Sequence, residues 1–200
     1  MKMKKIYWTL ILIISLFVGC TDLDEELNDT VEGSVAKESV DTKSLLIAAY
    51  QALRIFDTQD NIFALQEHTS DEMAGPTRGP DWDDAGIWRV LHTHDWTSSH
   101  TYINSAYNGL LSGIFRATQV LEFAPTPSQA AEARFLRAFF SFHMVDNFGL
   151  VLGREPGEDL TQPPSIYLNR PEGIEFVISE LEEIINDLPA SGGASIATQN

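Results

Sequence analysis

Two things are scarce in this chain, cysteine and positive charge. Its 200 residues include a single cysteine, Cys20, so no disulfide can form within the chain. Lysine and arginine number 13 against 29 aspartates and glutamates, which gives a formal net charge of −16. So acidic a composition argues against nucleic acid as a partner and against electrostatic attraction to anionic lipid.

Catalytic signatures are also missing. The sequence contains no GxSxG nucleophile elbow, no glycine-rich phosphate loop and no HExxH motif. A glycosidase needs two carboxylates at a set separation, and an acidic chain offers pairs such as Glu67 with Asp71 or Glu72 by chance. We therefore predict that the protein is not an enzyme. After Cys20, no apolar run approaches the roughly 20 residues that a membrane span requires.

The N-terminus carries an export pattern. Its basic residues are Lys2, Lys4 and Lys5. An apolar run follows, Ile6–Val18, and a glycine then precedes Cys20. A positive start, a short apolar middle and a small residue before the break are typical of a signal peptide. The pattern resembles a bacterial lipoprotein signal, which implies that residues 1–19 are removed and that Cys20 carries lipid such as palmitate. An ordinary signal peptide with a stray cysteine is the alternative.

Residues 20–38 are rich in acidic side chains and poor in apolar ones, which predicts a tether between Cys20 and the folded part. The acidic cluster resembles the export signal of lipoproteins that some Gram-negative cells display on their outer surface. A solvated linker explains the same composition and is the simpler interpretation. Lipid on Cys20 would be the sole membrane anchor.

Residues 39–200 show the apolar periodicity of helices. The spacing predicts helices over 41–56, 61–67, 101–123, 129–148 and 171–188, and an extended stretch at 150–152. Pro125 and Pro127 are expected to end one helix, with Ser128 capping the next. The body is therefore predicted to be all-α. The two long central helices with their short turn look like an antiparallel hairpin of the sort stacked in helical repeats.

The helix expected over 171–188 has a clear apolar stripe. The stripe comprises Ile174, Val177, Ile178, Leu181, Ile184, Ile185 and Leu188. The acidic residues expected to face solvent are Glu180, Glu182, Glu183 and Asp187. On the apolar helix over 129–148, we expect the stems of Arg134 and Arg137 to pack while their guanidinium groups pair with acids or carbonyls.

Two segments are similar to a known family. Residues 131–142 read AEARFLRAFFSF, and residues 146–149 read DNFG. Residues 170–189 begin with Arg-Pro and include LEEII and DLP. These segments closely resemble the signature helix and the next segment of the SusD/RagB family of nutrient-binding outer-membrane lipoproteins. Cys20 with its acidic tether fits the same order.

The resemblance implies a helical fold built on repeats like tetratricopeptide units, with long inserted loops that form the ligand site. It also implies a partner, a SusC-like TonB-dependent transporter, to which the lipoprotein hands oligosaccharides or other nutrients. Family members are more than about twice as long, so we expect residues 39–200 to be the N-terminal part of such a domain, truncated at its C-terminus. The alternative function is a helical-repeat adaptor that caps a transporter without binding glycan itself.

The loop over 71–100 has the composition of a sugar site. Sugars present flat C–H faces and hydroxyl rims, so a binder needs aromatic faces together with carboxylate, amide or arginine groups. The candidate ligand-binding residues are Arg78, Trp82, Asp83 and Trp96. The surroundings of the two tryptophans fit binding and packing equally. Trp88 has apolar neighbours and is predicted to be core.

Histidines in the same region do not form a metal motif. They are His68, His92, His94 and His100. Zinc sites use histidine and aspartate, yet nothing here fixes three ligands at a known spacing, and exposed loop histidines are the simpler interpretation. Asp81, Asp83 and Asp84 lack the glycine and terminal glutamate of a calcium loop. We therefore expect neither a metal nor a cofactor.

Overall fold

The computed structural model describes residues 40–58, 60–75 and 83–188. The chain divides into two units, Met1–Gly33 and Ser34–Asn200, and all described residues belong to the second. The predictions for the signal peptide, Cys20 and the tether therefore lie outside the described residues. So do the predictions for Arg78, Asp81, Trp82 and the last twelve residues.

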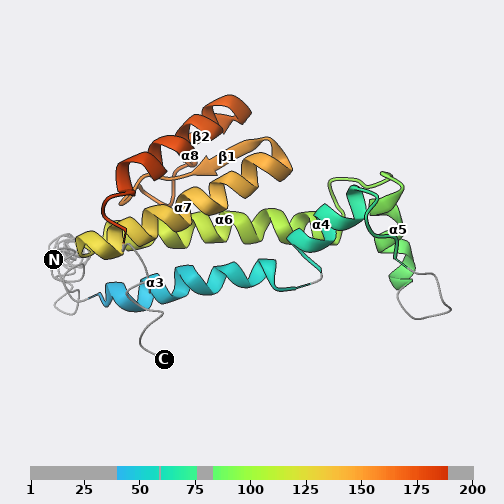
Figure 1. Ribbon diagram of the computed structural model, residues 1–200, viewed down its shortest axis with the longest axis horizontal. Helices are drawn as coiled ribbons and strands as arrows, with labels where there is room; N and C mark the ends of the chain where they lie inside the picture. Colours follow the sequence, from blue (N-terminus) through green and yellow to red (C-terminus); the bar gives the residue numbers. More distant parts are fainter. Residues whose placement is uncertain (1–39, 59, 76–82, 189–200) are drawn as a thin grey trace, which may run out of the picture. The chain divides into compact units, whose positions relative to one another are not determined.

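The described part is mostly helical, as the periodicity predicted (Figure 1). Its elements are α3 (Thr42–Gln51), η1 (Ala52–Phe56), α4 (Ile62–Thr69), η2 (Asp84–Gly86), α5 (Ile87–His92), α6 (Thr101–Glu122), α7 (Pro127–Phe148), β1 (Leu150–Gly153), β2 (Ile166–Asn169) and α8 (Arg170–Ile184). The long helices α6 and α7 pack against each other, α3 packs on both, and α8 packs on α7. The predicted hairpin of two central helices is confirmed.

A short two-stranded antiparallel sheet accompanies the helices, and the described part is otherwise helical as the all-α prediction expects. β1 pairs with β2 from Leu150 opposite Asn169 to Gly153 opposite Ile166. Only the first strand was expected as an extended segment, because β2 has four residues and too short an alternation to stand out. The sheet sits between α7 and α8 in sequence and contacts both helices.

The turn between α6 and α7 differs from the prediction by two residues. Thr126, not Ser128, caps α7: its hydroxyl accepts a hydrogen bond from the Gln129 amide, and the Gln129 side chain accepts one from the Thr126 amide. Pro127 begins the helix rather than ending the previous one, since the first helical position needs no N–H donor. The sequence Thr-Pro-Ser-Gln thus forms a capping box.

The other long helices also begin at capping residues. Asp41 caps α3 by accepting a hydrogen bond from the Lys43 amide. Asn169 and Glu172 form a capping box at the start of α8, with Pro171 in the first turn. The α-helix ends at Ile184 and turns follow it, so the predicted end at residue 188 is too late.

The core is densest where α6 meets α7. The Phe140 ring is fully buried against Gly113, and a Cβ placed on that glycine would lie 2.6 Å from three ring atoms. The glycine therefore provides the space that the ring occupies. On the outer side of α7, Phe135 and Phe142 are 40% and 44% exposed, so its apolar surface extends beyond the partners that cover it, α3, α6 and α8.

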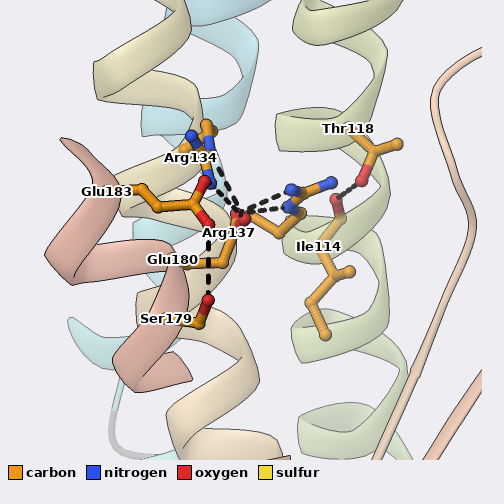
Figure 2. A network of polar contacts seen from close by, with 7 residues as sticks. All are labelled: Ile114, Thr118, Arg134, Arg137, Ser179, Glu180 and Glu183. Carbon is orange, nitrogen blue, oxygen red and sulfur yellow. Dashed lines mark hydrogen bonds and ion pairs between the residues drawn. The ribbon is translucent and has the colours of Figure 1, made fainter. Parts of the chain in front are cut away.

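A buried charge network joins α7 to α8 (Figure 2). Arg137 donates through Nε and Nη2 to Glu180 Oε2, at 2.9 and 2.6 Å. Arg134 donates to Glu180 Oε1 at 3.2 and 2.8 Å, and also to Glu183 at 2.6 Å. The structural role predicted for both arginines is confirmed. Hydrogen bonds to Glu180 raise the pKa of Arg134 above its ordinary value.

The network reverses the predicted orientation of one acidic residue. Glu180 was expected to face solvent, yet its side chain is only 8% exposed between the two arginines. Because α8 turns this carboxylate inward, part of its apolar stripe turns outward. Ile178, Leu181 and Ile185 are 49%, 36% and 68% exposed. The buried face of α8 therefore combines apolar residues of the predicted stripe, Val177 and Ile184, with the paired carboxylate of Glu180.

Candidate functional site

The rings of His68, Trp88 and Tyr102 stack in a row in the region between α4 and α6. His68 stacks on Trp88 with ring centroids 5.2 Å apart, and Trp88 stacks on Tyr102 at 4.4 Å. The Trp88 indole N–H donates to Asp84 at 2.7 Å. Trp88 is buried, which confirms its prediction as core.

Two histidines of this region are buried, contrary to the expectation of exposed loop histidines. Burial lowers the pKa of His68, which lies in the ring stack. His100 caps α6: its Nδ1 accepts from the Ile103 amide, and its Nε2 contacts the Ile87 carbonyl oxygen at 3.0 Å. Both rings therefore hold the loop onto the helices. Among the residues described, no three His, Cys, Asp or Glu side chains are arranged to hold a metal.

The backbone is unusual in the same region. Five non-glycine residues among those described have a positive φ, and four of them lie between positions 71 and 94: Asp71, Asp84, Ala85 and His94. Side chains other than glycine rarely adopt this conformation unless the surrounding contacts impose it. Such residues gather at ligand sites more often than elsewhere, which favours a functional role for this loop.

The turn that precedes Trp96 and the His94 ring hold Trp96 in place. Within the preceding turn, the His94 amide donates to the Leu91 carbonyl at 3.3 Å, and the Asp95 amide donates to the Val90 carbonyl at 2.9 Å. The His94 ring contacts the Thr69 carbonyl oxygen at 2.9 Å and meets the Trp96 ring edge-on, with centroids 5.2 Å apart. Trp96 is nonetheless 40% exposed. The loop thus presents an aromatic ring toward solvent.

Beside Trp96 lies a cavity of about 190 Å³. Its lining residues are Leu65, Thr69, Trp96, Ile103, Asn147 and Phe148, and we call it the Trp96 cavity. They come from the end of α4, the loop after α5, the start of α6 and the end of α7. The Asn147 amide N–H donates to the His143 carbonyl at 2.9 Å, which orients the side chain. The Thr69 hydroxyl donates to the Leu65 carbonyl within α4, so its oxygen serves a ligand as an acceptor. The cavity therefore combines aromatic and aliphatic walls with a hydroxyl oxygen and a carboxamide.

The structure places the four predicted ligand-binding residues in different situations. Trp96 lines the cavity. Asp83 pairs with Arg89 at 2.9 Å and is not among the lining residues. Arg78 and Trp82 lie outside the described residues. Asn147 and Thr69 were missed as site residues, and the only signal for the first was an amide in the last turn of a largely apolar helix.

Comparisons with known proteins identify no relative of this chain: no family model matches it, and neither the curated proteins nor the solved structures give a significant match. Within ranges 40–58, 60–75 and 83–188, no helix combines the length and apolarity needed to cross a membrane. The features of the protein that bear on its function are therefore the Trp96 cavity and the sequence patterns.

Proposed function

We propose that the protein is a lipid-anchored, outer-membrane binder of glycans or related nutrients that delivers them to a SusC-like TonB-dependent transporter. The observation that carries the proposal is the Trp96 cavity, where a partly exposed indole adjoins polar groups. Sugar rings stack their C–H faces on such an aromatic surface and direct their hydroxyls to amides and hydroxyls. The similarity of the helices α7 and α8 to SusD/RagB segments supports the same function.

The size of the cavity sets the expected mode of binding. About 190 Å³ is smaller than the roughly 300–1,000 Å³ of pockets that enclose drug-sized ligands. A single sugar unit, or one end of a longer chain, suits this space better than a fully enclosed oligosaccharide. We propose that the ligand rests partly on the exposed Trp96 ring and is released without any chemical change.

We further propose that the helices are arranged as in tetratricopeptide-like repeats. The antiparallel pairs α6–α7 and α7–α8 each bury their facing surfaces, as stacked helical repeats do. The segment between α4 and α6, with its short helix α5 and its unusual backbone, then corresponds to an inserted loop. In this arrangement the repeats support the loop, and the loop supplies the ligand site.

Replacing Trp96 with alanine tests the glycan site. We expect Trp96→Ala to weaken retention in polysaccharide-containing gels by at least about tenfold, because a central aromatic contact commonly contributes 2 kcal/mol or more to binding. Tyr167→Ala is the matched control, since this tyrosine is 69% exposed on β2 and lies outside the cavity. Equal retention of the two variants would remove Trp96 from the ligand site.

Replacing the single cysteine tests the anchor. We expect Cys20→Ala to move the protein from the membrane fraction to the soluble fraction, because the lipid on Cys20 is the proposed anchor. None of the helices that the structure describes is long and apolar enough to cross a membrane. Ser39→Ala serves as the control and should stay with the membrane. The measurement is fractionation of cells followed by immunoblotting. A Cys20→Ala protein that remained in the membrane fraction after alkaline extraction would contradict the lipid anchor.

The exposed stripe of α8 favours a second candidate, the helical adaptor. Ile178, Leu181 and Ile185 share one face at helical spacing and point away from α7. Exposed apolar stripes of this kind often mark protein–protein contacts. A glycan-array screen separates the two candidates. Binding that is lost in Trp96→Ala supports the nutrient binder, and an empty array with an intact transporter complex supports the adaptor.

A further inference from the structure

A second cavity of about 180 Å³ lies between the middle of α6 and the start of the loop after β1. Its lining residues are Leu111, Ile114, Phe115, Thr118, Leu152, Gly153, Arg154 and Pro164, and we call it the hairpin cavity. None of them lines the Trp96 cavity. On α6, Ile103 and Leu111 are eight residues apart, which places the two cavities roughly 12 Å apart along the helix.

The walls of the hairpin cavity offer almost no polar group to a ligand. The Thr118 hydroxyl donates to the Ile114 carbonyl at 2.9 Å within α6, as Figure 2 also shows. The Arg154 guanidinium donates to Glu158, to the Asp159 carbonyl at 3.1 Å and to the Gln162 carbonyl at 2.6 Å. The hydroxyl proton and three of the five guanidinium N–H groups are thus engaged within the protein, and Glu158 neutralises the charge of Arg154. The rest of the lining is apolar.

Hydrogen bonds within the loop after β1 fix the conformation of the wall that this loop gives to the hairpin cavity. Glu158 accepts hydrogen bonds from the Glu155 amide at 3.0 Å and from the Ser165 hydroxyl at 2.8 Å. Asp159 accepts from the amide and the hydroxyl of Thr161, at 2.9 and 2.8 Å. These bonds lower the pKa of both carboxyl groups, so the network persists at neutral pH. A wall held in this way prevents the cavity from collapsing when it is empty.

We propose that the hairpin cavity binds a neutral aromatic group of about ten non-hydrogen atoms. An enclosed apolar cavity of about 150 Å³ in another protein accepts benzene. The hairpin cavity has about 180 Å³ but is open to solvent on one side, where Phe115 is 36% exposed, so a somewhat larger ring system can enter it with one edge in water. Phe115 offers its ring there for stacking or edge contact. The net charge of −16 disfavours anionic ligands.

The proposal does not depend on glycan binding or on the lipid anchor. It depends on the apolar lining residues and on the loop network alone. A failure of the Trp96 experiment would leave it intact, and its own failure would not affect the Trp96 cavity.

Indole is the probe, and methyl NMR of the full chain is the measurement. We expect saturable shifts at the methyl groups of Leu111, Ile114 and Leu152, with a Kd of about 1 mM or tighter. Indole-3-carboxylate should bind at least about tenfold more weakly, because Glu158 already neutralises the charge of Arg154 at the cavity and the net charge of −16 repels an anion. Shifts that rise linearly without saturation, or that centre on other methyl groups, would overturn the proposal.

Filling the cavity provides the decisive variant. A Cβ at position 153 would lie 3.5 Å from Ile114 and 3.7 Å from Ile166, so a side chain fits there without forcing the backbone. Gly153→Val, in a strand that favours β-branched residues, should weaken indole binding at least about tenfold. Leu111→Phe fills the same space from α6 if the first variant fails to fold. Leu160→Ala, at an exposed loop position outside the lining, should bind indole as the parent does.

A filled variant that folds and still binds indole with the parent's affinity would refute the assignment. Loss of binding in Leu160→Ala alone would also refute it, since the ligand would then lie on the outer surface of the loop.

Discussion

Replacing Glu180 with alanine should lower the free energy of unfolding by about 3–5 kcal/mol. Two guanidinium groups of α7 converge on this carboxylate, and Arg137 is itself buried, with a side chain only 9% exposed. Removing the carboxylate leaves a buried positive charge without its acceptor, which costs far more than the intact pair contributes. Urea unfolding followed by circular dichroism measures the change, with the slope of the transition expected to stay constant.

Glu183→Ala is the matched control, because Glu183 binds the same Arg134 from the same helix at 2.6 Å. Its side chain is 60% exposed, and solvent screens its pair with Arg134. We therefore expect little change in unfolding free energy for this variant. High salt should reduce its small effect and leave the effect of Glu180→Ala largely unchanged. Equal losses for the two variants would contradict the view that burial makes the Glu180 network important.

A double replacement without charges tests whether the intact pair of Glu180 and Arg137 itself stabilises the fold. Exchanging Glu180 and Arg137 together for leucine and methionine removes both buried charges at once, and Arg134 keeps its more exposed pair with Glu183. The combined variant should be nearly as stable as the parent, or more stable. A loss as large as that of Glu180→Ala would show that the network stabilises the fold by more than mutual compensation of its charges.

The same residue shows what sequence patterns could and could not reveal. The period of α8 and its first-turn proline were visible, and its start was predicted within one residue of the observed Arg170. Its buried face was predicted only in part. Val177 and Ile184 are buried as the stripe predicted, but Glu180 cannot be told from Glu182 and Glu183 in sequence. Arg134 and Arg137 lie 46 and 43 residues from Glu180 and select it through tertiary contact. Local periodicity contains no information about that pairing.

The candidate site shows the same limit. The tryptophans of the loop over 71–100 were recognisable from composition, and Trp88 was correctly assigned to the core from its apolar neighbours. The partners of Trp96 in its cavity, Thr69 and Asn147, come from helices on either side of it in the chain. Which side chains would meet there depended on how α4 and α7 pack on α6, and a single sequence does not specify this.

The second large effect concerns the contact between Gly113 and Phe140. Gly113→Val should destabilise the protein by about 3 kcal/mol, although valine is intrinsically a better helix residue than glycine. A Cβ at this position already lies 2.6 Å from three atoms of the Phe140 ring, and two further methyl groups would enter the same space. Phe140→Ala alone should cost about 3–5 kcal/mol through the cavity that it leaves.

Combining the two changes should recover part of the loss, because the valine then occupies the volume that the ring has vacated. We expect the double variant to be more stable than the sum of the single losses predicts, by about 1–3 kcal/mol. The measurement is again urea unfolding, on all four members of the double-mutant cycle.

Gly109→Val is the control, since a Cβ there would meet Ile55 rather than Phe140, at 2.9 Å. Combined with Phe140→Ala, it should give losses that add within about 0.5 kcal/mol, because a side chain at position 109 meets Ile55 and does not enter the space that the Phe140 ring vacates. Strict additivity at Gly113 would mean that the helices respond by moving apart, and the close approach of α6 and α7 would then not be set by this glycine.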